Sequence, residues 1–322
     1  MCRMEIYRGQ AQAPPRAPCV LTLGVFDGVH LGHQAVLREA VALARALECP
    51  AGIVTFGQHP RGLLEGRAPD FVTTLEHRLH LFARAGADFT WVLDFTPELS
   101  RLAAEQFARS FLVERLALRV LVLGFDSRFG HDRVGPSSPE LAGIGQKLGF
   151  EIRIIPPVLT RAGLAISSSL IREAILGGRL REAEELLGRR VSVLGQVARG
   201  QARGRRLGYA TANLDLGREV RPPFGVYATL AELRGRKYGS VTNVGYRPTV
   251  APPTAAGQKP DLLVETHLFD FQGDLYGEWL EVHFIEKLRD ERRFSDVEAL
   301  TEQIGRDEAQ ARKLLEAQGL CH

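Results

Sequence analysis

The feature that most constrains the fold is a change of pattern near residue 187. Between residues 20 and 187, segments typical of buried strands alternate with segments of helical periodicity. After residue 188, short strand-like segments follow one another, separated by turn residues and with no helix between them. The first pattern is typical of a parallel sheet with helices on both faces, and the second of a small antiparallel barrel. We therefore predict an α/β domain over residues 1–187 and a β-barrel domain with a terminal helix over residues 188–322.

The expected elements follow from these patterns. In the first domain, strands are expected at residues 20–25, 51–56, 89–93, 119–124 and 151–155. Helices are expected there at residues 34–47, 75–85, 98–116, 139–148 and 169–187, the last divided into two short helices at Gly177 and Gly178. The proline-containing residues 1–18 are expected to be irregular. In the second domain, strands are expected at residues 191–198, 225–233, 237–243, 262–269 and 280–286. A final helix is expected over residues 296–318, with Ser295 and Glu298 as its capping box.

Composition excludes several classes of protein. A net charge of +3 over 322 residues gives no strong field for nucleic acid or a membrane surface. No apolar run reaches the ~20 residues of a membrane span. The four cysteines are scattered and form no CxxC pair, so they predict reduced thiols and no metal site. We expect a cytoplasmic protein with neither nucleic acid nor a membrane as partner; protein partners cannot be predicted.

The segment GVFDGVHLGHQ joins the first expected strand to the first expected helix. Gly24 and Gly28 let the backbone approach a phosphate, and the helix N-terminus offers amide groups and a positive dipole end. His30 and His33 lie three residues apart and can face one ligand, with Gly32 between them leaving room for adenosine. Imidazoles there can stabilise the charge that develops when the α-phosphate of ATP is attacked. The alternative is two surface histidines beside a turn.

The segment ISSSLIR opens a later expected helix. Hydroxyls such as those of Ser167 and Ser168 can cap a helix and bond phosphate oxygens. Arg172 would project from the first turn as a cation for the β- and γ-phosphates. The alternative is an ordinary serine cap with a solvated arginine.

A basic, glycine-rich stretch opens the second domain. It is a weak signal, since it lacks the GxxxxGK[ST] pattern of P-loop enzymes, and an RNA-binding or merely solvated loop is the alternative. Its candidate residues for binding the phosphates of ATP are Gly195, Gly200, Gly204, Arg205 and Gly208.

The residues after this stretch suggest a metal site and a base. Thr211 and Asn213 alternate along an extended segment, so their oxygen atoms share a face and suit Mg²⁺. Glu265 lies in the middle of the apolar run LLVETHLF. Strand alternation leaves open whether its side chain faces the interior or an exposed surface. An inward carboxylate would need a partner or a task.

Longer motifs extend these observations to a known family. The HxGH string after a first strand resembles the nucleotidyltransferase superfamily. The string TLGVFDGVHLGH resembles the bacterial bifunctional riboflavin kinase/FAD synthetases, as do TFGQHP, LGFDSRFGHDRVG, ISSSLIR, GYATAN, PFGVY, VTNVGYRPT and VETHLFDFQGDLYG. Three positions depart from the family pattern. Ser127 stands for Phe, Ser169 for Thr and Ala210 for Pro, and the first of these puts one flavin contact in doubt.

The resemblance implies a Rossmann-like nucleotidyltransferase domain followed by a riboflavin kinase barrel. It implies ATP binding in the first domain by Gly24, Phe26, Asp27, Gly28, Ser167, Ser168 and Arg172. It implies flavin binding by His59, Asp126, Arg128, Phe129 and Arg289, although the segment around Asp126 also reads as an ordinary turn with a packed Phe. Glu265 is implied as the base of the kinase, Mg²⁺ and ATP as cofactor and co-substrate, and riboflavin, FMN and FAD as the flavins bound.

Three alternatives to a bifunctional enzyme remain. One is a monofunctional FAD synthetase whose barrel only binds flavin, which Ala210 and the extended APPTAAGQKPD segment suggest. Another is a non-enzymatic flavin sensor. The third is a transferase for a different acceptor, because the HxGH signature alone does not define the acceptor.

Overall fold

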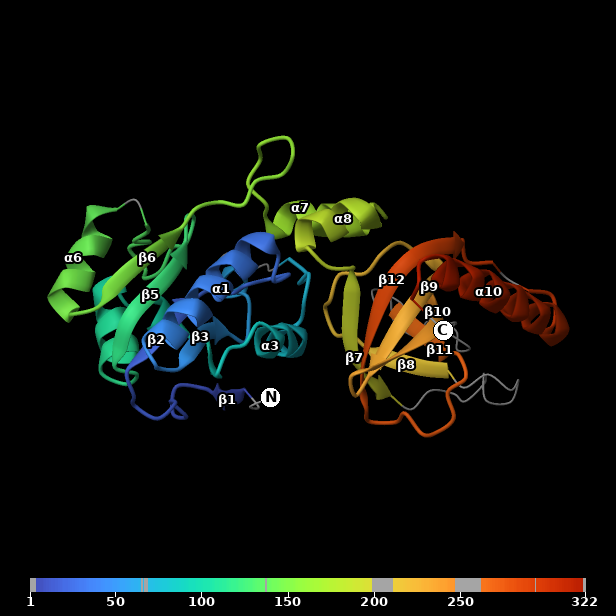
Figure 1. The fold of residues 1–322 in the computed structure, drawn as a ribbon, viewed down its shortest axis with the longest axis horizontal. Coiled ribbons are helices and arrows are strands. Elements are labelled where there is room, and N and C mark those ends of the chain that lie inside the picture. The colour runs from blue at the N-terminus through green and yellow to red at the C-terminus, as the bar shows by residue number, and fades with distance from the viewer. Residues whose placement is uncertain are drawn as a thin grey trace. The chain divides into compact units, whose positions relative to one another are not determined.

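The computed structural model describes residues 4–64, 66, 69–136, 138–198, 211–246, 262–292 and 294–320. The chain divides into two units (Figure 1). The first comprises Met1–Phe71 and Leu75–Ser168, and the second Val72–Thr74 and Ser169–His322. By these contacts the segment 169–187 groups with the second unit. The domain boundary predicted at residue 187 stays a prediction.

The first unit contains a six-stranded parallel sheet of order β1-β4-β3-β2-β5-β6. Its strands are β1 (Glu5–Arg8), β2 (Cys19–Leu23), β3 (Ala51–Phe56), β4 (Phe89–Leu93), β5 (Leu118–Gly124) and β6 (Glu151–Ile155). Its helical segments are α1 (Leu31–Ala46), α2 (Pro60–Leu64), α3 (Leu75–Arg84), α4 (Pro97–Ser100), α5 (Ala104–Phe107), the π-helix η1 (Ala108–Val113) and α6 (Pro139–Leu148). The predicted α/β fold is confirmed.

Both faces of this sheet are buried. Along β2, Leu21 packs into one hydrophobic cluster and its neighbour Val20 into another. Successive side chains of a strand point to opposite faces, so the two clusters lie on the two sides of the sheet. Burial on both faces explains why the strands read as continuous apolar runs.

Two expectations for this unit are wrong. Residues 5–8 form an edge strand paired with β4, not an irregular segment. This strand is short and mostly exposed, so it carries no hydrophobic pattern. The single helix expected over residues 98–116 is instead α4, α5 and η1. Ala103 is extended between α4 and α5, with ψ of 156°, which ends the helical path there.

The second unit is a closed barrel of strand order β10-β11-β8-β7-β12-β9. Its strands are β7 (Ser192–Ala198), β8 (Thr211–Asp215), β9 (Gly225–Leu233), β10 (Arg236–Tyr246), β11 (Leu262–Leu268) and β12 (Trp279–Arg289). Its helices are α7 (Ser168–Leu176), whose first residue belongs to the first unit, α8 (Leu180–Leu187) and α10 (Val297–Ala317). The barrel and the terminal helix confirm the predicted fold of the second domain.

The interior of the barrel contains a chain of hydroxyl groups. The Thr229 hydroxyl is 2.8 Å from those of Ser240 and Thr242, and the Thr242 hydroxyl is 2.9 Å from that of Thr266. All four side chains are fully buried. Each hydroxyl has a partner, so the polar interior carries little desolvation penalty.

Helix α10 packs against the outer surface of the barrel. Its residues Ala311 and Leu315 pack in one buried cluster with Ala228 and Leu230 of β9. The N-cap of this helix is Asp296, whose carboxylate accepts a hydrogen bond from the backbone N–H of Ala299 at 2.8 Å.

The capping box predicted at Ser295 is therefore wrong by one position. The Ser295 hydroxyl instead donates to the Asp296 carboxylate.

Candidate active sites

The loop between β2 and α1 has an uncommon backbone conformation. Phe26, Gly28 and Val29 have positive φ angles of 54°, 80° and 39°. Glycine adopts such angles at no cost, but a phenylalanine and above all a β-branched valine are strained there. Strain of this kind persists only where surrounding contacts hold it, and it occurs preferentially at functional sites.

Side chains from three other positions hold this loop through its carbonyl groups. The bonds, with the donor first, are Ser168 Oγ to Asp27 O at 2.9 Å, Gln34 Nε2 to Val29 O at 2.9 Å, and Arg78 Nη1 to Val25 O. Gln34 opens a helix predicted from the sequence, and Ser168 directly precedes another. The role of Arg78 is a finding of the structure.

His30 and His33 lie together at the start of α1. His30 is the N-cap and is only 6% exposed, and its Nδ1 accepts a hydrogen bond from the backbone N–H of His33 at 3.4 Å. The two imidazoles are stacked, with ring centroids 3.6 Å apart and an interplanar angle of 20°. A neutral imidazole that accepts at Nδ1 carries its proton on Nε2, where it can donate to a phosphate oxygen.

Gly32 leaves space for the His30 ring. A Cβ at this position would lie 3.1 Å from Cε1 of His30. The structure thus shows a different reason for the glycine than the predicted room for adenosine. Phe26 packs edge-on against the His33 ring, with centroids 5.2 Å apart.

The predicted flavin residues of the first unit differ in their surroundings. Asp126 and Arg128 are exposed in the turn after β5, and His59 is half-buried beside Phe71. Phe129 is only 8% exposed and packs in the core, which agrees with the alternative of a turn with a packed ring. Flavin contacts of these residues stay predictions.

Of the predicted phosphate-binding residues in the segment ISSSLIR, Ser168 has a side-chain hydrogen bond to the loop before α1. The Ser168 hydroxyl donates to the loop carbonyl of Asp27, whereas a bond to phosphate was predicted for it. Arg172 lies on α7, in the part of the chain that groups with the second unit. Phosphate contacts of Ser167, Ser168 and Arg172 stay predictions.

Glu265 occupies the middle of a polar row across three barrel strands. It pairs directly with Asn213 of β8 on one side and with Asn243 of β10 on the other. Its neighbours Val264 and Thr266 are buried in the interior, so Glu265 faces outward and is half-buried. The structure thus resolves the orientation that strand alternation left open.

Thr211 contacts this carboxylate directly. Its Oγ1 donates a hydrogen bond to Oε1 of Glu265 at 2.5 Å. A hydroxyl that donates one bond keeps its lone pairs, so Thr211 can still ligate a cation. Asn213 lies two residues along β8 and faces the same way. This set of neutral oxygens beside a carboxylate fits Mg²⁺ held mainly by ATP phosphates.

Two further polar residues adjoin the row and were missed in the sequence. Asn243 Nδ2 donates to Oε1 of Glu291 at 3.2 Å. The same carboxylate lies over Gly245, where an added Cβ would come within 1.9 Å of Oε1. The signal that could have identified Asn243 is its place in the motif VTNVGYRPT, which resembles the family.

Arg289 and Gly195 have structural contacts of their own. The Arg289 guanidinium donates to both carboxylate oxygens of Asp307, which is 3% exposed, at 2.7–3.0 Å. A Cβ at Gly195 would lie 2.6 Å from the carbonyl oxygen of Asp215. The close approach of β7 and β8 thus explains this glycine without a phosphate. A flavin contact of Arg289 and an ATP contact of Gly195 stay predictions.

The other predicted ATP-binding residues of the barrel are Gly200, Gly204, Arg205 and Gly208, and they lie outside the described residues, as do Ala210 and the segment 251–261.

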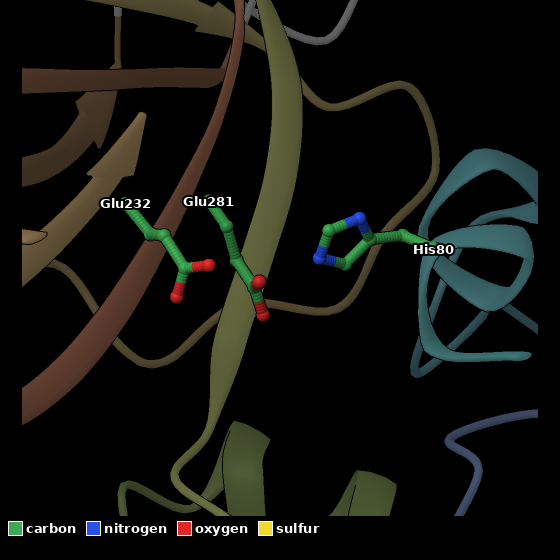
Figure 2. Close-up of side chains that lie close together, drawn as sticks. All are labelled: His80, Glu232 and Glu281. Carbon is green, nitrogen blue, oxygen red and sulfur yellow. The ribbon is translucent and has the colours of Figure 1, made fainter. Parts of the chain in front are cut away.

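A pair of carboxylates lies elsewhere in the barrel. Glu232 of β9 and Glu281 of β12 occupy directly paired positions, and Figure 2 shows both side chains. The Ser192 hydroxyl donates to Glu281 at 2.7 Å, and His283 Nε2 lies 3.6 Å from Glu232. His80, also drawn, belongs to the first unit. The two carboxylates form an acidic group of the barrel wall with Ser192 and His283 as neighbours.

Comparisons with known proteins cover both units. The profile of the family described as FAD synthetase matches residues 12–170, and that described as riboflavin kinase matches residues 187–315. The bifunctional riboflavin kinase/FMN adenylyltransferase of Escherichia coli (strain K12) is 36% identical over 314 residues, covering 96% of this chain and 97% of that protein. The protein of the same description from Bacillus subtilis (strain 168) is 33% identical, with 92% of each covered.

A solved structure from Streptococcus pneumoniae is similar over the same length. It has a TM-score of 0.77 and 32% identity, and covers 96% of this chain and 99% of its own. It is described as a macrolide-efflux protein, which differs from the description of the curated relatives. No helix among the described residues of this chain is long and apolar enough to cross a bilayer. On the strength of identity over nearly the whole length, the chain belongs to the family of bifunctional riboflavin kinase/FMN adenylyltransferases.

Proposed function

We propose that the chain makes FAD from riboflavin in two successive phosphate transfers. The barrel transfers the γ-phosphate of ATP to the terminal ribityl hydroxyl of riboflavin, giving FMN and ADP. The first unit transfers AMP from a second ATP to the phosphate of FMN, giving FAD and pyrophosphate. The observation that supports this function most strongly is membership of the family over nearly the full length, with one family profile matching residues 12–170 and the other residues 187–315.

In the kinase step, Glu265 acts as the general base. Its Oε1 accepts a hydrogen bond from the Thr211 hydroxyl, and this bond orients the carboxylate. The carboxylate can then accept the proton of an incoming hydroxyl. Asn213 and Thr211 would hold Mg²⁺ together with ATP, and a bound ion would neutralise phosphate charge. Asn213 and Asn243 flank Glu265 in the strand register, so both can orient the acceptor.

In the adenylyl step, the first unit supplies position and charge rather than a nucleophile. The acceptor phosphate of FMN itself attacks the α-phosphorus, and pyrophosphate leaves. His30 and His33 donate hydrogen bonds to oxygens on which negative charge develops. Side-chain hydrogen bonds to three carbonyls of the loop before α1 hold these donors in one geometry, which lowers the barrier more than mobile groups would.

A product analysis tests this function. Purified protein is incubated with riboflavin, ATP and Mg²⁺, and the yellow products are separated over time. We expect FMN first and FAD later, with ADP and pyrophosphate in matching amounts. FAD from supplied FMN without FMN from riboflavin would instead indicate the monofunctional alternative. Absence of both products would indicate a sensor or another acceptor. The cytoplasmic location predicted from the sequence stays a prediction.

Thr211→Ala is expected to weaken the kinase step only. Loss of the hydroxyl removes a metal ligand and a hydrogen bond to a charged group, and such a bond contributes roughly 1.5–3 kcal/mol. We expect kcat/KM for MgATP in FMN formation to fall at least about tenfold. Thr211→Ser keeps the hydroxyl and is expected to retain most activity. Unchanged kinetics of the alanine variant would exclude Thr211 from the site.

A further inference from the structure

A charged residue lies on the buried face of α3. Arg78 follows Leu75 by three residues and precedes Leu79 and Phe82, which pack in the core. Apolar residues normally occupy this face of an amphipathic helix. The Arg78 side chain is fully buried. An arginine at such a position needs hydrogen-bond partners and a compensating charge, since burial of a lone charge is strongly unfavourable.

The groups to which Arg78 donates hydrogen bonds lie where β2 and β3 end. Nη1 donates to the Val25 carbonyl and to Thr55 Oγ1 at 3.1 Å, and Nη2 donates to the Phe56 carbonyl at 3.2 Å. The guanidinium also lies over the ring of Phe71, 5.2 Å from its centroid. One planar group thus joins the ends of two parallel strands, at the sheet edge where ligands bind in α/β folds.

The compensating charge belongs to the loop itself. Asp27 is buried and interacts electrostatically with Arg78. Burial lowers the pKa of Arg78 from the ordinary 12.5 to about 10, and the attraction of Asp27 opposes this shift. The guanidinium therefore stays charged at neutral pH. Its hydrogen-bond partners are the Val25 and Phe56 carbonyls and the Thr55 hydroxyl, all of them neutral.

The bond to the Val25 carbonyl is one of three in which every second carbonyl of the loop accepts a hydrogen bond from a side chain. The carbonyls of Val25, Asp27 and Val29 accept from Arg78, Ser168 and Gln34 respectively. In a trans peptide the C=O and the next N–H point in opposite directions. Fixing these three carbonyls therefore also fixes the directions of the N–H groups of residues 26, 28 and 30, which belong to the strained loop.

We propose that Arg78 is a positioning residue for adenylyl transfer, which holds the strained loop and, through it, His30 and the loop amides in the geometry that the transition state needs. This inference rests on the proposed FMN adenylyltransferase activity of the first unit. Arg78 itself does not touch substrate. Fixed donors stabilise developing charge only when their directions are set in advance, so the effect is expected in kcat rather than in substrate binding.

This role is tested by the kinetics of three full-length variants: Arg78→Met, Arg78→Lys and the surface control Arg8→Met. Arg8 is half-exposed and pairs with Glu76 of the same helix α3. For FAD formation from FMN, we expect kcat of Arg78→Met to fall about 100-fold, as small misplacements of reacting groups can cause. KM values for ATP and FMN should change much less. Arg78→Lys keeps the charge and one donor group, and should recover part of kcat. Arg8→Met should match wild type.

Hydrogen exchange separates positioning from a general loss of stability. In Arg78→Met, we expect faster exchange for amides of residues 25–33 and unchanged protection in β2, β3 and β4. Unchanged kcat in Arg78→Met would overturn the proposal, and so would loss of protection across all these strands, which would mark Arg78 as a residue of global stability. If wild type itself forms no FAD from FMN, the proposed function fails instead.

Discussion

His33→Ala is expected to abolish FAD formation while FMN formation from riboflavin continues at the wild-type rate. Removal of one preorganised donor to a developing oxyanion typically lowers kcat by about 10²–10³. In this chain the loss is compounded, because the His33 ring stacks on His30 at 3.6 Å and packs against Phe26. An alanine would therefore remove the His33 donor and also the ring against which His30, the other donor, is stacked.

Two assays on the same preparation measure this effect. Pyrophosphate release with FMN and ATP reports the first unit, and ADP release with riboflavin and ATP reports the barrel. His131→Ala is a suitable control, because His131 is an exposed histidine of the same unit. A parallel decline of both activities in His33→Ala would mean that the two reactions share one site, contrary to the present assignment.

Glu265→Gln is expected to have the opposite effect. The amide keeps the shape and can still accept the Thr211 hydroxyl, but it cannot take the proton of the ribityl hydroxyl. General-base catalysis contributes about 10²–10⁴-fold, so FMN formation should fall by that range. FAD formation from supplied FMN should be unchanged.

The matched control for this variant is Glu286→Gln, an exposed glutamate on β12 of the same barrel. The ratio of kcat values for Glu265→Gln and Glu286→Gln isolates the base from the general loss of a negative charge. If kcat for FMN formation fell less than about tenfold in Glu265→Gln, Glu265 would not be the general base, because so small an effect lies below the usual contribution of such a group.

Much of this account could be predicted from the sequence because local signals were strong. The alternation of buried strands with helices defined the α/β unit, and the glycine-rich corner with His30 and His33 lies directly after the second strand of the chain. Thr211 and Asn213 were recognised as one face of an extended segment, and Glu265 as a carboxylate in an apolar run. Only the pairing of β8 with β11 in the fold brings Thr211 and Glu265 together, 54 residues apart in the chain. The local patterns therefore identified these residues but not their contact.

What could not be predicted depends on contacts between distant segments. Arg78 lies 53 residues after Val25 in the chain, and only the folded sheet edge brings the two together. The orientation of Glu265 depends on which face of β11 closes the barrel interior, and period-2 alternation does not determine this. The edge strand β1 carries no hydrophobic signal, because its exposed side chains contribute little to the core.

The most direct measurement of the central claim, that two separate sites on one chain act in sequence, is a mixing experiment. His33→Ala and Glu265→Gln proteins are each incubated with riboflavin, ATP and Mg²⁺, alone and together. The account predicts FMN only from the first, almost no product from the second, and FAD from the mixture after a lag in which FMN accumulates. FAD formed from riboflavin by either variant alone at the wild-type rate, or a mixture that stops at FMN, would contradict it.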